Sequence, residues 1–160
     1  MKQFLRNTIY TFFTVLLVNH AVFAQSISID PPNPIFRIST PAATGNSKTG
    51  NVIVQFSIMN YSISKAQFQL FPFETKALDE MNVQHSPVSI MLGRKSFKKQ
   101  EMVSVDLVPG DSISCQILFS KFRKGYRYVT SMTAKNRVLM SPLFDQESVL
   151  NIKDLPIYWQ

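Results

Sequence analysis

The chain has 160 residues, with 17 Lys and Arg against 10 Asp and Glu, and a single cysteine. This length suits one domain with a hydrophobic core and is short for two. One cysteine excludes an intramolecular disulfide, so the core must be stable without a covalent cross-link.

The first 24 residues have the composition of a secretory signal peptide. Lys2 and Arg6 precede an apolar run, Ile9–Val18, and the small residues in Val22-Phe23-Ala24 predict cleavage before Gln25. The alternative is a membrane anchor, but the uninterrupted apolar run is shorter than the roughly 20 residues that span a bilayer. We therefore expect an exported protein.

From residue 25 onward, short stretches alternate between apolar and polar residues, which is the pattern of half-buried strands. The first is Gln25–Asp30, and a proline-rich turn separates it from a second at 35–40. A polar loop containing glycine and serine is expected at Pro41–Asn51. Further strands are expected at 52–62, 65–73, 88–92, 101–107, 112–119, 126–134, 137–144 and 148–160.

In the strand expected at 52–62, alternation places the apolar side chains of Val52, Val54, Phe56 and Ile58 on one face. Residues 74–82, ETKALDEMN, are expected to form a short helical turn.

The single cysteine of the chain lies in a predicted strand. A Pro-Gly-Asp corner precedes residues 112–119, in which Cys115 alternates in phase with Ile113, Ile117 and Phe119. This phase points the thiol into the core. A nucleophilic cysteine needs a nearby basic group or a helix N-terminus to lower its pKa. We therefore interpret Cys115 as a buried packing residue.

Short strands separated by turns predict an all-β fold, specifically an immunoglobulin-like antiparallel β-sandwich in which residues 25–160 form a single domain. Three features of the sequence carry a family resemblance. They are Asn60 after an early strand, the corner Leu107–Asp111, and Tyr126 and Tyr128 in a later aromatic strand. In this order they resemble immunoglobulin-like sandwiches of the bacterial envelope, and in particular the N-terminal domain of periplasmic pilus chaperones.

The resemblance implies a periplasmic or envelope protein that works by contact with other exported proteins. It also implies a basic pair that holds the C-terminal carboxylate of a subunit, for which Arg37 and Lys121 are the candidates. The chain departs from the chaperone pattern because it has no second domain.

No catalytic set stands out in the sequence. His85 lies in a polar stretch before Pro87 and is expected to be a solvated loop residue, and no G-x-S-x-G motif is present. One histidine and one buried cysteine in the mature chain cannot form a zinc site. We expect no metal, no cofactor and no enzymatic activity, with a hydrolase built on an unrecognised carboxylate pair as the alternative.

Two segments, Gly93–Gln100 and Lys121–Arg127, combine basic residues with aromatic ones. This combination is typical of binding to anions, and in an exported protein it indicates an anionic glycan, a lipid or an acidic protein rather than nucleic acid. The alternative is that these are solvated hairpins whose lysines keep edge strands from pairing. The candidate partner-binding residues are Arg94, Lys95, Phe97, Lys98, Lys99, Lys121, Arg123, Lys124, Tyr126 and Arg127.

The two ends of the mature chain, Ser26–Thr40 and Leu155–Gln160, are apolar or aromatic. We expect them to complete the sandwich; the alternative is that one of them pairs with a sheet edge of a neighbouring subunit. Tyr158 and Trp159 join the candidate partner-binding residues because such side chains often anchor interfaces.

These observations predict a non-enzymatic, exported protein–protein interaction module in the periplasm or cell envelope. Its partners would be other envelope proteins, and its role that of an accessory or structural subunit of an assembly such as a pilus or secretion apparatus. The alternatives are a periplasmic chaperone-like carrier of an exported subunit and a binder of an anionic glycan or lipid.

Overall fold

The computed structural model describes residues 25–98 and 102–160. The predicted signal peptide, residues 1–24, and Lys99 of the first basic segment lie outside these ranges. No helix among the described residues is long and apolar enough to cross a membrane. The described chain folds into strands and turns, which confirms the all-β prediction. The strands are β1 (Ser26–Asp30), β2 (Phe36–Ile38), β3 (Ala42–Asn46), β4 (Asn51–Asn60), β5 (Ala66–Leu78), β6 (Gln84–His85), β7 (Pro87–Leu92), β8 (Lys95–Lys98), β9 (Val103–Leu107), β10 (Ser112–Phe119), β11 (Tyr128–Met140) and β12 (Phe144–Trp159).

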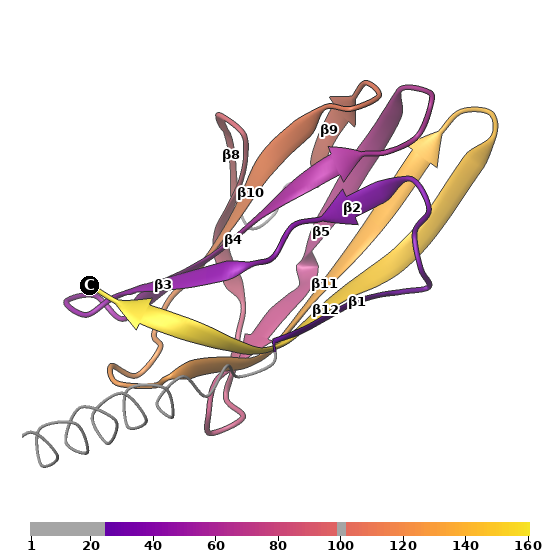
Figure 1. The fold of residues 1–160 in the computed structure, drawn as a ribbon. Helices are drawn as coiled ribbons and strands as arrows, with labels where there is room; N and C mark the ends of the chain where they lie inside the picture. The colour runs from indigo at the N-terminus through magenta and orange to yellow at the C-terminus, as the bar shows by residue number, and fades with distance from the viewer. Residues whose placement is uncertain (1–24, 99–101) are drawn as a thin grey trace, which may run out of the picture.

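The long strand β12 connects two groups of paired strands (Figure 1). Along most of its length it pairs with β1 and β11, and β11 pairs with β5, which is flanked by β9 and β6. At Ile157–Trp159 it pairs in parallel with β3, and the order continues through β4, β10, β7 and β8, with β2 also beside β4. The other pairs of described strands are antiparallel, so the parallel pair of β3 and β12 makes the sheet mixed and corrects the prediction of a purely antiparallel arrangement.

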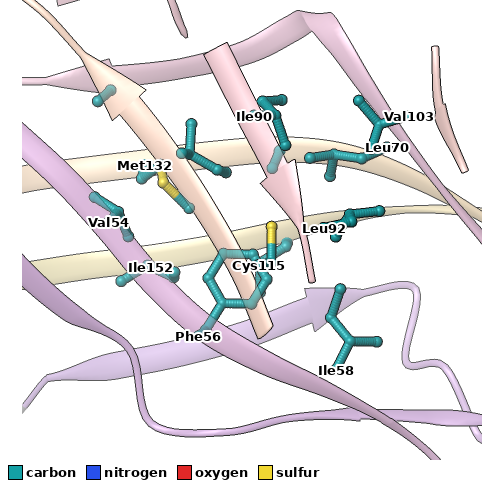
Figure 2. Packing of buried hydrophobic residues seen from close by; sticks show 14 of the residues in the cluster. Val54, Phe56, Ile58, Leu70, Ile90, Leu92, Val103, Cys115, Met132 and Ile152 are labelled. Atoms are coloured by element: carbon teal, nitrogen blue, oxygen red, sulfur yellow. The ribbon is translucent and has the colours of Figure 1, made fainter. Parts of the chain in front are cut away.

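The two groups of strands enclose a hydrophobic core. The core takes Phe56 and Cys115 from the group that contains β4 and β10, and Met132 and Ile152 from the group that contains β11 and β12 (Figure 2). Each of these four side chains is at most 2% exposed. Burial of apolar surface contributes about 25 cal/mol per Å², so this core supplies the main stabilisation of a chain that has no disulfide.

The predicted inward phases of two central strands are confirmed. β4 and β10 are neighbours in antiparallel register, with Phe56 opposite Cys115, so their apolar faces coincide. Each strand therefore presents one continuous apolar face to the core, as alternation requires. The fully buried members of these faces are Val52, Val54, Phe56, Ile58, Cys115, Ile117 and Phe119.

The helical turn expected at residues 74–82 is wrong. β5 continues to Leu78, and its residues Thr75 and Ala77 are buried where β5 pairs with β11. Residues 71–74 have no pairing partner on β11 and form a bulge. Pairing with β11 resumes after the bulge, at Thr75. Long-range pairing with β11 thus outweighs the local helix preference of Ala and Leu in this stretch.

The polar loop expected at Pro41–Asn51 is only half correct. Its first part is β3, which pairs with β4 on one side and with the end of β12 on the other. The small residues of β3 make this possible, because Gly45 leaves room for the ring of Trp159. The turn between β3 and β4 is held by the Asn46 carbonyl oxygen, which accepts a hydrogen bond from the Gly50 amide at 2.9 Å.

The separate strands expected at 126–134 and 137–144 are one continuous strand, β11, followed by a turn into β12. Asn136, which lies between the two expected strands, is buried and its side chain is hydrogen-bonded. Its Oδ1 accepts a hydrogen bond from the Ser148 hydroxyl at 2.7 Å, and its Nδ2 donates to the Ala134 carbonyl oxygen at 3.3 Å. A paired polar group inside the core costs little compared with an unpaired one.

Candidate interaction surfaces

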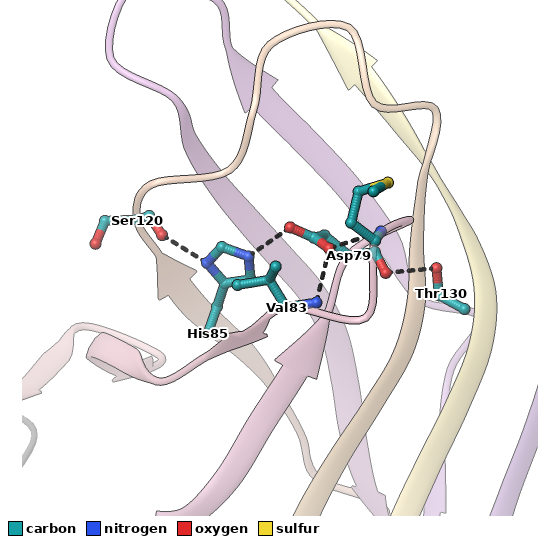
Figure 3. Close-up of polar contacts among 6 residues, drawn as sticks. Asp79, Val83, His85, Ser120 and Thr130 are labelled. Carbon is teal, nitrogen blue, oxygen red and sulfur yellow. Dashed lines mark hydrogen bonds and ion pairs between the residues drawn. The ribbon is translucent and has the colours of Figure 1, made fainter.

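A buried polar corner joins the turn after β5 to the loop after β10 (Figure 3). His85 is 7% exposed, so the expectation of a solvated loop histidine is wrong. Its Nε2 lies 3.0 Å from Oδ2 of Asp79, and its Nδ1 lies 3.1 Å from the carbonyl oxygen of Ser120. Oδ1 of Asp79 also accepts hydrogen bonds from the amides of Met81 and Val83, both at 2.9 Å.

These contacts engage both sides of the His85 ring. Each ring nitrogen lies within hydrogen-bond distance of an oxygen atom, Oδ2 of Asp79 or the carbonyl oxygen of Ser120. Burial by itself raises the pKa of Asp79, but the hydrogen bonds from His85 and from the two amides outweigh it and hold that pKa below its ordinary value. Neither nitrogen of His85 is left to act as a general base.

The loop between β10 and β11, residues 120–127, is anchored at this corner. The ring of Phe122 stacks on His85, with 4.0 Å between ring centroids, and is only 3% exposed. The Phe122 amide donates to the carbonyl oxygen of Gly50 at 2.9 Å. Gly50 has a φ of +70°, and a Cβ on it would lie 2.7 Å from the Phe122 carbonyl oxygen, so a glycine is required here.

The far end of the same loop is held by Glu80. Its Oε1 accepts hydrogen bonds from the amides of Arg127 at 2.5 Å and Tyr128 at 3.1 Å. The Thr130 hydroxyl donates to the carbonyl oxygen of Asp79 at 3.0 Å. The turn at 79–83 and the loop at 120–127 therefore form one rigid unit, in which aromatic side chains face inward and basic ones face solvent.

The end of β12 packs against other residues of its own chain. This agrees with the expectation that the C-terminal residues complete the sandwich. The Trp159 indole nitrogen donates to the carbonyl oxygen of Tyr126 at 2.6 Å, and its ring lies against Gly45. The Gln160 amide donates to the Gly45 carbonyl oxygen at 2.8 Å. Tyr158 points outward and is 67% exposed.

The two basic segments are separate surfaces. Arg94 lies in the turn between β7 and β8, while Lys95, Phe97 and Lys98 lie on β8 at an edge of the sheet. β7 and β10 lie between this edge and β4. The second segment occupies the loop at 120–127, where its charged members are exposed and Tyr126 is half-buried. Leu92, two residues before Arg94, pairs with Cys115, six residues before Lys121, so Arg94 and the second segment lie apart along β10. The exposed basic members of the second segment are Lys121, Arg123, Lys124 and Arg127.

The basic pair implied by the chaperone resemblance is not assembled. Arg37 pairs with Met59 near one end of β4, whereas Phe119, two residues before Lys121, pairs with Val52 near the other end. Seven residues of strand separate these points, which is about 23 Å. Arg37 instead lies over the ring of Tyr61, 4.1 Å from its centroid, beside a cavity of about 260 Å³.

The outer strand β1 presents an open edge. Among the described strands it pairs only with β12, from Ser26 opposite Lys153 to Asp30 opposite Val149. Ile27 and Ile29 lie opposite the buried Ile152 and Leu150, so they face the core side, yet Ile27 is still 36% exposed. The sequence indicated the strand but not its position at an edge.

The described residues bring together no group of three or more His, Cys, Asp or Glu side chains that could hold a metal ion. Cys115 is fully buried, and burial raises the pKa of its thiol to about 12. The thiolate is therefore not formed at neutral pH, and the interpretation of Cys115 as a packing residue is confirmed.

No protein-family model and no curated protein sequence matches the chain. Among solved structures, the CooA pilin subunit from enterotoxigenic Escherichia coli is similar with 11% identity and a TM-score of 0.46, over 79% of this chain and 99% of the pilin. An inactive mutant of the GH20 exo-β-N-acetylglucosaminidase from Vibrio harveyi is also similar, with 12% identity and a TM-score of 0.39, over 78% of this chain and 18% of the enzyme. These are distant similarities, and what those proteins do is not assigned to this chain on their basis.

Proposed function

We propose that the chain is a non-enzymatic, exported interaction module and a structural or accessory subunit of an envelope assembly such as a pilus or secretion apparatus. Partners join it by adding a strand beside β1. The observation that carries this proposal is the open edge of β1, where main-chain groups and the half-covered side chain of Ile27 are both available. Strand addition uses such main-chain groups for affinity and alternate side chains for register.

The other sheet edges are less suited to strand addition. β8 carries Lys95 opposite the buried Leu92, and a charge on the core side of an edge strand opposes pairing with another chain. β2 has three residues. On the edge formed by β9 and β6, residues 71–74 of β5 form a bulge that contains Pro72, which has no amide hydrogen to donate. β1 has five residues, with neither proline nor lysine among them.

The pairing order supports the immunoglobulin-like assignment. β3, β4, β10 and β7 follow one another in one group, and β5, β11 and β12 follow one another in the other. A four-strand sheet packed on a three-strand sheet is the arrangement of an immunoglobulin constant-type sandwich. β1, β2, β6, β8 and β9 are then additions to these two sheets, and β1 extends the three-strand sheet.

The non-enzymatic part of the proposal is supported by the state of the two most reactive side chains. The imidazole of His85 has both nitrogens engaged, and the thiol of Cys115 is buried and protonated. A chaperone-like carrier is less well supported, because Arg37 and Lys121 lie at opposite ends of β4.

The test is a pair of substitutions on β1 that add the same charge to opposite faces. Ile27→Lys places a charge on the face that an added strand would cover, whereas Ser28→Lys places it on the outer face. After mild cross-linking of intact cells, we expect Ile27→Lys to abolish co-recovery of envelope proteins and Ser28→Lys to retain it. Equal recovery with both variants, at unchanged melting temperature, would rule out strand addition at β1.

A further inference from the structure

Three turns meet at one end of the molecule and are hydrogen-bonded to one another. The turn at 46–51 contacts the loop at 120–127 through the bond between the Phe122 amide and the Gly50 carbonyl oxygen, 2.9 Å long. The turn at 79–83 contacts the same loop through the bond from the Arg127 amide to Glu80. We call the surface formed by residues 46–51, 79–83 and 120–127 the basic end; it lies at the end of the molecule where β3 and β12 finish (Figure 1).

The basic end carries an excess of exposed positive charge. No ion pair joins its exposed cations to a carboxylate within the described part of the chain. Glu80, the exposed carboxylate of this surface, already accepts two backbone amides through Oε1. The exposed basic residues are Lys48, Lys121, Arg123, Lys124 and Arg127.

Two basic residues at the opposite end of the strands are neutralised in contrast. Lys65 forms an ion pair with Asp106 at 2.8 Å, and Arg137 with Asp145 at 2.5 Å. The basic end therefore gathers five exposed cations on one surface, which is a distribution that attracts a polyanionic surface.

The basic end also exposes apolar side chains among its cations. Met81 is 68% exposed and Val83 is 52% exposed, and both lie in the turn that Glu80 fixes to the loop at 120–127. A soluble polyanion needs only the charges. A bilayer surface uses both features, since head groups attract the cations and the acyl boundary accepts apolar side chains.

We infer that the basic end docks onto a membrane surface containing anionic lipids, with the cations on the head groups and with Met81 and Val83 at the acyl boundary. The backbone of this surface is already ordered by the contacts of His85, Phe122 and Glu80, so binding orders little additional chain. Lipid binding uses residues outside β1, so it goes beyond the proposed strand addition and does not depend on it.

The test measures cosedimentation of the full-length chain with vesicles of phosphatidylglycerol and phosphatidylcholine, and with vesicles of phosphatidylcholine alone. One variant carries Arg123→Ser and Lys124→Ser; Lys121 is left unchanged because its φ is +66°. The matched control carries Arg94→Ser and Lys95→Ser, which removes the same charge from the exposed turn and start of β8. Residues 1–24 are common to all variants, so a difference between variants on the same vesicles comes from the substituted residues.

At low salt we expect Arg123→Ser with Lys124→Ser to weaken binding to anionic vesicles about 30-fold, and the control pair to change it less than about threefold. Equal weakening by both pairs, or an equal effect of Arg123→Ser with Lys124→Ser on the two kinds of vesicle, would overturn the inference.

A third variant separates a bilayer from a soluble polyanion. Met81→Ser with Val83→Ser is expected to weaken binding to anionic vesicles and to leave binding to soluble polyphosphate unchanged. If these substitutions have no effect on vesicles and polyphosphate competes fully, the surface recognises a soluble polyanion and the membrane assignment is wrong.

Discussion

The imidazole of His85 lies 3.0 Å from the carboxylate of Asp79, and the two side chains are 7% and 4% exposed. This pair holds the turn after β5 against the loop at 120–127, and it positions Phe122 through ring stacking. A buried hydrogen-bonded pair of this kind matters most when His85 is removed, because the Asp79 carboxylate is then left buried without this partner.

Replacing His85 should therefore destabilise the fold strongly. We expect His85→Ala to lower the free energy of unfolding by about 3 kcal/mol or more, measured by urea denaturation. Ser120→Ala is the matched control, because the Ser120 contact uses its main-chain carbonyl oxygen, which the substitution retains. A loss below about 1 kcal/mol for His85→Ala would show that the pair contributes little.

The same pair gives stability a defined dependence on acid. The folded-state pKa of Asp79 is lowered from 3.8, so the unfolded chain takes up the proton first as pH falls. The contribution of Asp79 is present above its unfolded pKa and is lost as pH falls through the lower, folded value. The difference in melting temperature between the native chain and Asp79→Asn should therefore shrink from pH 6 to pH 3. A difference that grows over this range would contradict the assignment.

Close packing of the last strand on β3 leaves no room for a larger residue at position 45. A Cβ on Gly45 would lie 2.5 Å from the ring of Trp159, so Gly45→Ala must displace the indole. We expect a loss of about 1–3 kcal/mol in unfolding free energy and a red-shifted emission from Trp159, the single tryptophan of the chain. Thr44→Ala, one residue earlier on β3, should leave the emission unchanged. An unshifted spectrum for Gly45→Ala would mean that the ring does not lie on Gly45 in solution.

Burial of Cys115 predicts a silent thiol. Its pKa of about 12 and its complete burial should keep it unreactive toward a chromogenic disulfide reagent at pH 8. Labelling should follow the urea unfolding transition and reach one thiol per chain. Rapid labelling of the native protein would mean that β10 opens locally or that the thiol faces solvent.

Strict alternation made the central strands predictable. The inward faces of β4 and β10 follow directly from the two-residue period around Phe56 and Cys115, because each strand is buried on one face only. β3 gave no such signal, since Ala, Thr and Gly are small and its burial depends on Trp159, more than 100 residues later. The helical turn at 74–82 failed for the same kind of reason, as pairing with β11 decides its conformation.

The candidate surfaces were only partly accessible to sequence reasoning. The basic composition of 121–127 was evident, but not that Phe122 turns inward or that Lys48 joins the surface through the Gly50 contact. His85 looked solvated because its polar neighbours are exposed, and its partner Asp79 is six residues away with no strand pattern between them. A prediction of these features would require the contacts between turns, which sequence periodicity does not report.

The central claim, that partners add a strand beside β1, is tested most directly by a photo-reactive amino acid in place of Ser28 in intact cells. The account predicts that illumination joins the chain to a distinct exported protein, and that Ile27→Lys in the same chain removes the adduct. If the probe at Ser28 gives no adduct while the same probe in place of Arg94 or Tyr158 does, contact is made elsewhere and the claim is wrong.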